Sequence, residues 1–250
     1  MKQEILFDRD LLKQNRKRAL TGFAQASFLH HEIANRIVEN VQFLNRKFEN
    51  ILEIAPLDEA LKKEFTQIFD HNFSWKSCES EESLSQESQS FDLILSNLNF
   101  HFINEIPQFL LQVKELLKPN GVFIASFFGE ENLSELAHML YKTENEIYGG
   151  ISPRMPPTID VKTAANLLQK AGFGDPTAEF AKIEVEYEDP KNLLKDLKMM
   201  GQGNILHKRS RRFMTKNFLN KILQNYREIY PNNEGGVCAT FEIVTVTGWK

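Results

Sequence analysis

The sequence predicts an α/β protein built on a mostly parallel β-sheet. Apolar runs at residues 51–54, 91–96 and 122–128 alternate with stretches of helical periodicity. Short continuous apolar runs are typical of parallel strands, because helices cover both faces of such a sheet. The 250 residues, 42% hydrophobic and 26% charged, have the composition of a globular protein and can bury a sizeable core.

Composition narrows the possible partners and compartments. The net charge of -4 gives no reason to expect a nucleic acid or an anionic membrane as partner. Two cysteines, Cys78 and Cys238, are too few for a disulfide scaffold or a thiolate metal site. No HExxH, paired-cysteine or nucleophile-elbow pattern occurs, and no apolar stretch is long enough to span a bilayer. We therefore predict a cytoplasmic protein with no metal site and no membrane insertion.

The predicted organisation is a single domain over residues 1–250. Residues 1–48 form N-terminal helices, since apolar residues recur there at helical spacing. Residues 49–130 carry the strand–helix alternation and form the core. Residues 131–250 supply further helices and closing strands.

The first strand of the core, residues 51–54, contains an acid and leads at once into a turn and a helix at 58–65. A strand, an acid, a turn and a helix in this order begin the cofactor site of Rossmann-like sheets. Residues 66–70 look like a second strand that ends in Asp70. A carboxylate about 20 residues after the first strand binds a ribose diol in such folds, although a turn residue is an equal alternative.

The segment of residues 76–90 is acidic, rich in serine and without apolar periodicity, so we expect a mobile loop. Only about 20 residues separate Asp70 from the next strand, and a crossover alone takes a dozen. The sheet is therefore expected to lack one edge strand–helix unit.

The remaining elements follow from apolar patterns and from turn residues. Residues 118–121 predict a turn, with Gly121 in the conformation that other residues avoid. Residues 149–157 form a loop stiffened by glycine and proline, and Gly172 ends a helix. Helices are expected at 108–117, 132–148, 158–171, 189–200 and 214–230, and strands at 182–187 and 240–248, the last pair forming an antiparallel edge.

Six segments of the chain carry recognisable motifs: residues 91–94, 98–107, 117–121, 149–154, 196–201 and 247–249. Together they resemble the class I S-adenosylmethionine-dependent methyltransferases. Within them, the chain is most similar to the branch of the malonyl-carrier-protein methyltransferase and of the mitochondrial complex I assembly factor that hydroxylates an arginine. The weakly specific matches are residues 91–94, 98–107 and 117–121. The more specific ones are residues 149–154, 196–201 and 247–249. The resemblance implies a Rossmann-like fold and S-adenosylmethionine as cofactor.

The turn after the first strand departs from this family. The family has an acid followed by two glycines, whereas this chain keeps the acid as Glu53 and carries Ala55, Pro56 and Leu57 beyond it. Glycine permits positive φ and close backbone approach, and proline removes an N–H donor. A lost hydrogen bond to a charged group costs roughly 1.5–3 kcal/mol, or about 10- to 150-fold in affinity. We therefore expect weakened cofactor binding, with residues 55–58 intruding at the methionine end.

The resemblance also gives each candidate site residue a role. Glu53, Ala55 and Asp70 would lie at the ribose and methionine ends of the cofactor, and Glu81 near its adenine. Ser96 would line the mouth of the site. His101 would carry a proton or simply pack among aromatic rings. Arg154 would grip a carboxylate of the substrate, or else tie its loop to the core.

Two functional hypotheses follow. In the first, the protein is a methyltransferase that acts on a small carboxylate, on a carrier-linked carboxylate or on a protein, or an arginine hydroxylase on the same fold. In the second, it is a non-catalytic assembly factor that binds a respiratory-complex subunit. The sequence does not give the oligomeric state.

Overall fold

The computed structural model describes residues 5–250, so residues 1–4 of the predicted N-terminal segment lie outside it. The chain forms two compact units. Unit 1 contains the described residues up to 26 together with 130–157 and 182–242, and unit 2 contains 27–129, 158–181 and 243–250. Each unit is built from three separate segments of the chain.

The described residues form a six-stranded sheet in the order β2-β1-β3-β4-β6-β5. The strands are β1 (Asn50–Ile54), β2 (Ser74–Cys78), β3 (Phe91–Asn97), β4 (Leu117–Phe128), β5 (Gly174–Tyr187) and β6 (Val237–Trp249). Strands β2, β1, β3 and β4 are parallel, and β6 is antiparallel to β4. The predicted mostly parallel sheet with an antiparallel C-terminal strand is confirmed.

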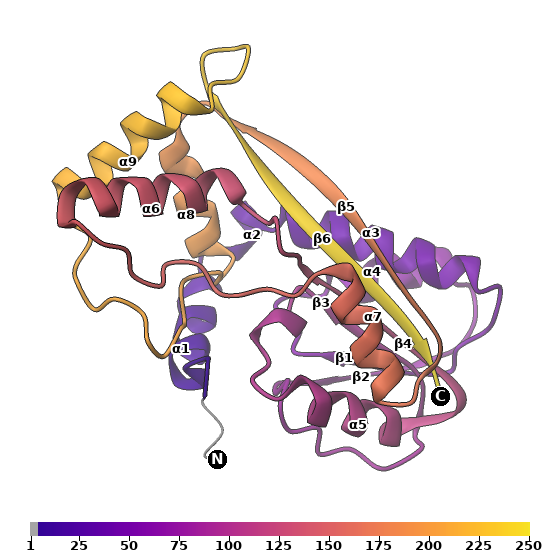
Figure 1. The fold of residues 1–250 in the computed structure, drawn as a ribbon. Coiled ribbons are helices and arrows are strands. Elements are labelled where there is room, and N and C mark those ends of the chain that lie inside the picture. The colour runs from indigo at the N-terminus through magenta and orange to yellow at the C-terminus, as the bar shows by residue number, and fades with distance from the viewer. Residues whose placement is uncertain (1–4) are drawn as a thin grey trace. The chain divides into compact units, whose positions relative to one another are not determined.

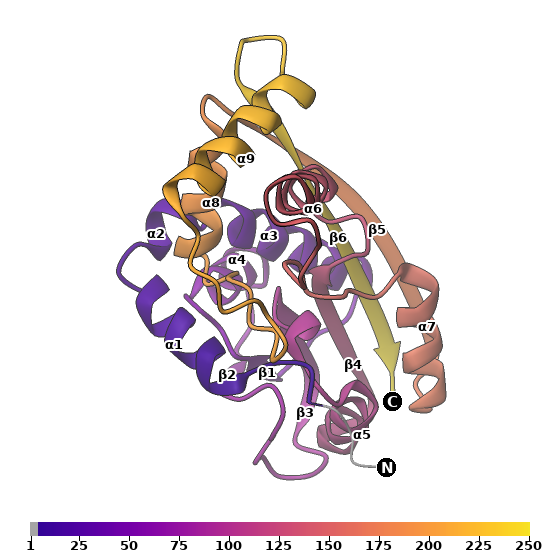
Figure 2. The same cartoon turned by 60° about the vertical axis from the view of Figure 1, so that its left-hand side comes forward.

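Helices cover both faces of the sheet in unit 2, with α3 and α4 on one face and α5 and α7 on the other (Figures 1 and 2). These helices are α3 (Phe28–Phe43), α4 (Ala60–Ile68), α5 (Ile106–Leu116) and α7 (Val161–Lys170). All seven residues of β3 are buried, as are the last eight of β4. Burial on both faces explains why these strands are continuous apolar runs in the sequence.

The second strand is not where the sequence analysis placed it. Residues 66–68 continue α4, and the strand is β2, which includes residues 76–78 of the segment expected to be a loop. Leu61 and Phe65 are buried at helical spacing, and the rings of Phe65 and Phe69 stack with centroids 4.3 Å apart. β2 escaped notice because it is an edge strand whose Ser74, Lys76 and Ser77 are exposed.

The predicted absence of one edge unit is confirmed within residues 5–250. β2 lies at the edge of the sheet, and a coil segment of residues 79–90 leads from it directly to β3. Serine and glutamine side chains tie this segment to α5. The amide of Leu84 binds the Gln112 side chain (3.1 Å), and Ser88 donates to the carbonyl of Glu115 (3.2 Å).

Residues 118–121, predicted to form a turn, lie within β4, and the residue with a special conformation is not the one expected. Asn120, with φ of 63°, takes the left-handed conformation, and Gly121 does not. Glycine is needed at position 121 for space, because a β-carbon there would lie 2.9 Å from Leu117 Cδ2 and from the carbonyl oxygen of Lys118. Gly172 ends a helix as predicted, since it follows the C-cap Ala171 of α7, and its φ is 81°.

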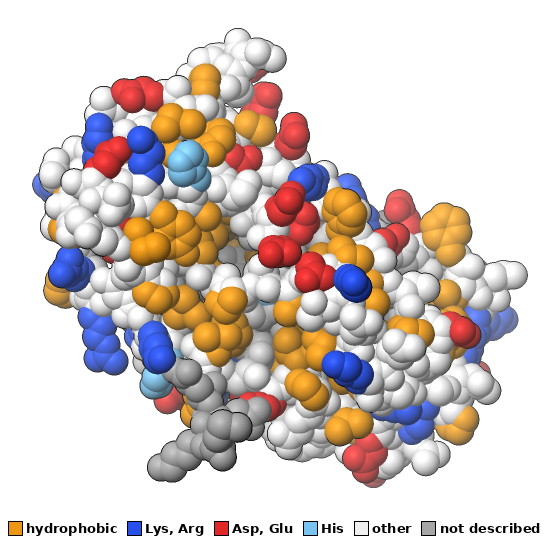
Figure 3. Space-filling model, in the orientation of Figure 1, with side chains coloured by type: hydrophobic (Ala, Val, Ile, Leu, Met, Phe, Trp, Pro, Cys, Tyr) orange, Lys and Arg blue, Asp and Glu red, His pale blue; other side chains and the backbone are white. Residues whose placement is uncertain are grey.

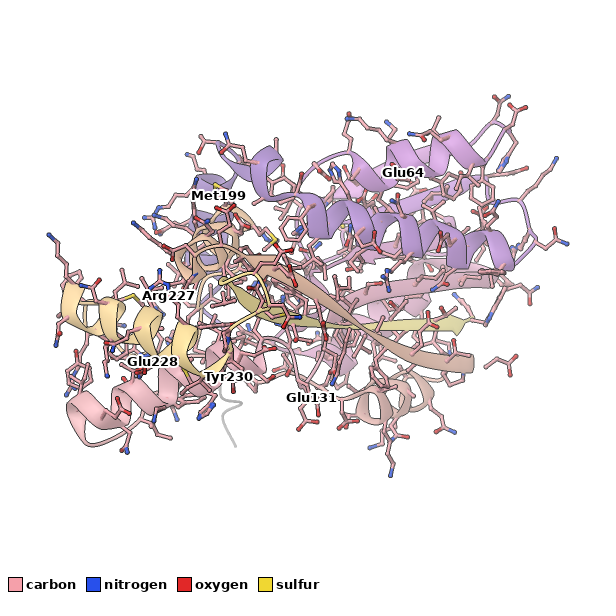
Figure 4. The ribbon with its side chains drawn as sticks, turned by 90° about the horizontal axis from the view of Figure 1, so that it is seen from above. Glu64, Glu131, Met199, Arg227, Glu228 and Tyr230 are labelled. Atoms are coloured by element: carbon pink, nitrogen blue, oxygen red, sulfur yellow. The ribbon has the colours of Figure 1, made fainter. Side chains whose placement is uncertain are left out.

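Unit 1 consists of helices packed on one another and on the parts of β5 and β6 within residues 182–242. Its helices are α1 (Arg9–Ala19), α2 (Phe23–Ala26), α6 (Ser134–Tyr148), α8 (Pro190–Met199) and α9 (Lys216–Ile229). α6 packs against α9, and α8 packs against α1, α2 and α9. Figure 4 labels Met199 on α8, whose side chain lies against Gly22, and Arg227 on α9, which pairs with Asp189 at 2.9 Å.

Two side-chain hydrogen bonds in unit 1 join helices to β6. The hydroxyl of the buried Tyr226 donates to the carbonyl of Cys238 (3.0 Å). The hydroxyl of Thr240 donates to the carboxylate of Glu135 on α6. Both bonds fasten a helix of this unit to β6.

No helix in residues 5–250 is both long enough and apolar enough to cross a membrane.

Candidate functional site

The candidate site lies in unit 2, where β1, β2 and β3 end. In open parallel sheets, ligands bind at the carboxyl ends of the strands. The register aligns these ends, since Ile54 of β1 pairs with Cys78 of β2 on one side and with Ser96 of β3 on the other. The backbones of Glu53, Ala55 and Ser96 therefore lie at this end of the sheet, and their roles toward a cofactor stay predictions.

The turn after β1 keeps a backbone conformation that suits glycine although the residue is alanine. Ala55 has φ of 49° and is 3% exposed. Its amide donates to the carbonyl of Cys78 (2.7 Å), and its carbonyl accepts from the side chain of Asn99 (3.1 Å). A left-handed alanine costs roughly 1–2 kcal/mol, so these neighbours hold a strained residue in place.

Asn99 is a site residue that sequence reasoning missed. Its carboxamide nitrogen donates to the carbonyls of Ile54 (3.2 Å), Ala55 (3.1 Å) and Asn97 (2.9 Å). Three acceptors share two hydrogens, so the side chain fastens the end of β1 to the end of β3. The sequence signals are an asparagine two residues beyond a buried strand, where side-chain amides often bind free backbone groups, and its place in the family-like segment of residues 98–107.

Glu53 lies in a nearly closed environment. It is 4% exposed, and the indole Nε1 of Trp75 donates to its Oε2 (3.1 Å). Burial raises the pKa of Glu53 from 4.5 to about 8, and the Trp75 hydrogen bond only partly opposes this shift. At neutral pH the side chain is mostly a neutral acid. It can accept or donate a hydrogen bond, but it offers little negative charge to a ligand.

Asp70 does not lie at the end of the second strand, and the prediction that placed it there is wrong. It is exposed and lies between α4 and β2, before the strand begins. Because β1 and β2 are parallel, the start of β2 lies beside the start of β1. Asp70 is therefore near the amino ends of these strands and remote from Glu53, which lies near the carboxyl end of β1. The acid that directly follows β2 is Glu79, which is also exposed.

The acids after β2 are held in different ways. Glu81 is buried, with 1% exposure. Glu82 Oε1 accepts from the backbone amide (2.9 Å) and the side-chain amide (3.0 Å) of Asn104. Burial, helped by the nearby Glu81, raises the pKa of the Cys78 thiol to about 11, so this thiol stays protonated at neutral pH. The adenine-side role of Glu81 stays a prediction.

His101 is packed among aromatic rings. It lies in the short 3-10 helix η1 (Phe100–Phe102) and is 6% exposed. Its ring centroid is 4.1 Å from that of Phe102 and 4.8 Å from that of Phe128. This geometry favours the packing interpretation, and the proton-carrier role stays a prediction.

Arg154 belongs to unit 1, where its guanidinium is already engaged. It binds Glu144 of α6 at 2.7 Å and lies 5.0 Å from the centre of the Phe218 ring. The same carboxylate accepts from the amide (2.9 Å) and hydroxyl (2.6 Å) of Ser152. Burial raises the pKa of Glu144, but the hydrogen bonds from Arg154 and Ser152 outweigh it, so the pKa lies below its usual range. Arg154 therefore ties its loop to α6, the structural alternative for this residue.

No group of three or more His, Cys, Asp or Glu side chains within residues 5–250 is arranged to hold a metal ion.

Comparison with known proteins shows the family to which this chain belongs. A family model described as "Methyltransferase domain" matches residues 57–172. The "Arginine-hydroxylase NDUFAF5, mitochondrial" of Danio rerio is 31% identical over 98% of this chain and 83% of its own length. The chain belongs to the class I S-adenosylmethionine-dependent methyltransferase superfamily, in the NDUFAF5 family.

Other similarities are shorter or weaker. The relative of the same name from Dictyostelium discoideum is 40% identical over 164 residues, which is 65% of this chain and 37% of that relative. The "Malonyl-[acyl-carrier protein] O-methyltransferase" of Gallionella capsiferriformans is 23% identical over 99% of this chain and 92% of its own length. The solved YcgJ protein from Bacillus subtilis shares the fold (TM-score 0.50, 10% identity, 86% of this chain and 98% of that one).

Replacing Glu53 should change how stability depends on pH. Folded Glu53 keeps a proton that the unfolded chain loses above pH 4.5, so its contribution is complete below that pH and is lost as the pH rises through about 8. Compared with that of Glu53→Gln, the free energy of unfolding of the wild type should fall by up to about 1.4 kcal/mol per pH unit between these two pH values. Urea unfolding at pH 5, 7 and 9 measures the difference. Glu49→Gln, at an exposed position, should show no such trend, and a flat difference for Glu53→Gln would contradict the burial argument.

Replacing Ala55 by glycine tests the strain in the turn. Glycine adopts the left-handed conformation without strain, and this gain should offset the loss of a buried methyl group. The free energy of unfolding of Ala55→Gly should therefore stay within about 0.5 kcal/mol of that of the wild type. The matched control is Ala125→Gly in β4, equally buried but in regular strand geometry, which should lose about 1–2 kcal/mol. Denaturant unfolding gives both values. Equal losses in the two variants would mean that Ala55 is not strained.

Proposed function

We propose that this chain binds S-adenosylmethionine at the ends of β1, β2 and β3 and acts on an arginine side chain of a protein, a subunit of a respiratory complex. The observation that supports the cofactor is the left-handed turn at Ala55, held by Cys78 and Asn99. The backbone there takes the conformation of a glycine although the side chain is larger. The cofactor would supply an electrophilic methyl group.

The charge of the site supports a cationic cofactor and a cationic target. Residues 53–59, at the end of β1 and beyond it, and residues 79–82, directly after β2, contain six acids and no Lys or Arg: Glu53, Asp58, Glu59, Glu79, Glu81 and Glu82. S-Adenosylmethionine carries a sulfonium and an ammonium group, and arginine carries a guanidinium. Carboxylates near such groups favour their binding, while the protonated Glu53 contributes little until the pH approaches 8.

The structure and the relatives support a protein arginine over a carboxylate as the target. Arg154, the residue predicted to grip a substrate carboxylate, already binds Glu144. The NDUFAF5 relative is also more similar than the malonyl-carrier-protein methyltransferase, at 31% against 23% identity.

A non-catalytic assembly role is the second candidate. It is favoured by the β-carbon of Ala55, by the missing N–H of Pro56 and by the neutral Glu53, which together weaken the methionine end. The proposed compartment is the cytoplasm, consistent with the free thiols of Cys78 and Cys238, while the NDUFAF5 relatives carry the word mitochondrial in their names.

Calorimetric titration with S-adenosylmethionine and S-adenosylhomocysteine tests the cofactor. We expect the wild type to bind weakly, and the double variant Ala55→Gly/Leu57→Gly to bind at least tenfold more tightly, because each restored contact contributes about 1.5–3 kcal/mol. Glu49→Gln serves as the control and should match the wild type.

Absence of binding by both the wild type and the double variant would overturn the cofactor proposal. The target is tested by mass spectrometry of respiratory-complex subunits from cells with and without the protein. An arginine that carries an added methyl group only when the protein is present supports the proposal. Unmodified arginines together with loss of the assembled complex would favour the non-catalytic role.

A further inference from the structure

Unit 1 contains a pocket of about 400 Å³ that the proposed function does not use. Its apolar wall consists of leucines from α6 and α8 and of two methionines: Leu136, Leu140, Leu194, Leu197, Met155 and Met214. Leu136 and Leu140 are one helical turn apart, as are Leu194 and Leu197, so each helix presents one face to the pocket. Figure 3 shows hydrophobic side chains gathered over the area of these helices.

The polar side chains at this pocket carry only positive charge. Arg18, Arg154 and Lys198 line it together with amide side chains, and none of the described residues that line it is Asp or Glu. The chain as a whole has a net charge of -4, so such a cluster is not a reflection of overall composition.

Two of these three cations are available to a ligand. Arg154 is paired with Glu144. Arg18 and Lys198 form no ion pair with a carboxylate of residues 5–250. Both are exposed, so the charges stay hydrated while the leucines beside them form a low-polarity surface.

We propose that this pocket binds an aliphatic carboxylate, a single chain of roughly eight to ten carbons with one anionic head, as befits a volume near the small end of ligand pockets. The chain lies against the leucines and methionines, and the head pairs with Arg18 and Lys198. Unbranched methionines adapt to a flexible chain, which suits an alkyl ligand better than a rigid one. All the residues that line the pocket belong to unit 1, so the proposal does not rest on cofactor binding.

Binding of an alkyl series to the full chain tests the apolar wall. Calorimetry without S-adenosylmethionine, below the micellar concentration, compares hexanoate, octanoate and decanoate. Each added methylene should tighten binding by up to about fourfold until the pocket is full. An affinity that does not change with chain length would overturn the proposal, and so would an absence of binding by all three.

Matched variants test the anionic head. The double variant Arg18→Gln/Lys198→Gln should weaken decanoate binding by about 5- to 20-fold and leave decanol binding unchanged. The control Lys17→Gln/Lys195→Gln removes two exposed cations of the same helices that do not line the pocket, and it should match the wild type. Decanol that binds as tightly as decanoate to the wild type would overturn the recognition of the anion.

A third variant separates the pocket from nonspecific surface binding. Leu197→Gln changes a half-buried lining residue and should weaken decanoate and decanol alike, while Leu20→Gln, at a 60% exposed position, should not. Thermal unfolding checks that every variant is folded. Equal binding by the wild type and Leu197→Gln would place the ligand elsewhere.

A wild type that self-associates and releases decanoate on dimer formation would assign the face to a second copy of the chain.

Discussion

The Asn99 carboxamide is the interaction on which the candidate cofactor site depends. It binds the carbonyls that end β1 and the carbonyl of Asn97 that ends β3, while the amide of Ala55 binds the end of β2. Three parallel strands are thus fixed at their carboxyl ends by one side chain and one backbone bond. Where a glycine would adopt this turn at no steric cost, an alanine must be held there by its surroundings.

This arrangement explains how the turn can keep a conformation typical of glycine while its residue is alanine. Neighbouring groups hold the backbone of Ala55, at a cost of roughly 1–2 kcal/mol for the left-handed residue. Cofactor binding is what this turn weakens, because the β-carbon of Ala55 and the ring of Pro56 stand where glycine would leave the backbone open to a ligand. The acid kept at position 53 is buried against Trp75 and is mostly neutral at pH 7, which removes part of the charge that a cationic ligand would use.

The sequence was a good guide where packing alone decides the structure. β3 and β4 were predicted because burial on both faces leaves an apolar run that no other element explains. β2 was missed because an edge strand can be polar, and the apolar residues before it belong to α4. Because of this one error, Asp70 was predicted at the carboxyl ends of the strands, whereas it lies before β2, near their amino ends.

The roles of single side chains were harder to predict, because they depend on partners that no spacing rule connects. Arg154 meets Glu144, which lies on a helix ten residues earlier, and this contact favours the structural interpretation that the sequence left open. Asn99 reaches across to Ile54 and Ala55 in the same way. Glu53 was identified as a site acid, but its protonation state follows from burial that only the structure reveals.

The most direct test of the central claim is an amide NMR titration of the isotope-labelled protein with S-adenosylhomocysteine. If the turn held by Asn99 is a working cofactor site, the signals of Ala55, Glu79 and Asn99 should shift together and saturate at one ligand concentration, and Asn99→Ala should abolish these shifts. Shifts confined to other parts of the chain, or equal shifts in Asn99→Ala, would contradict the account.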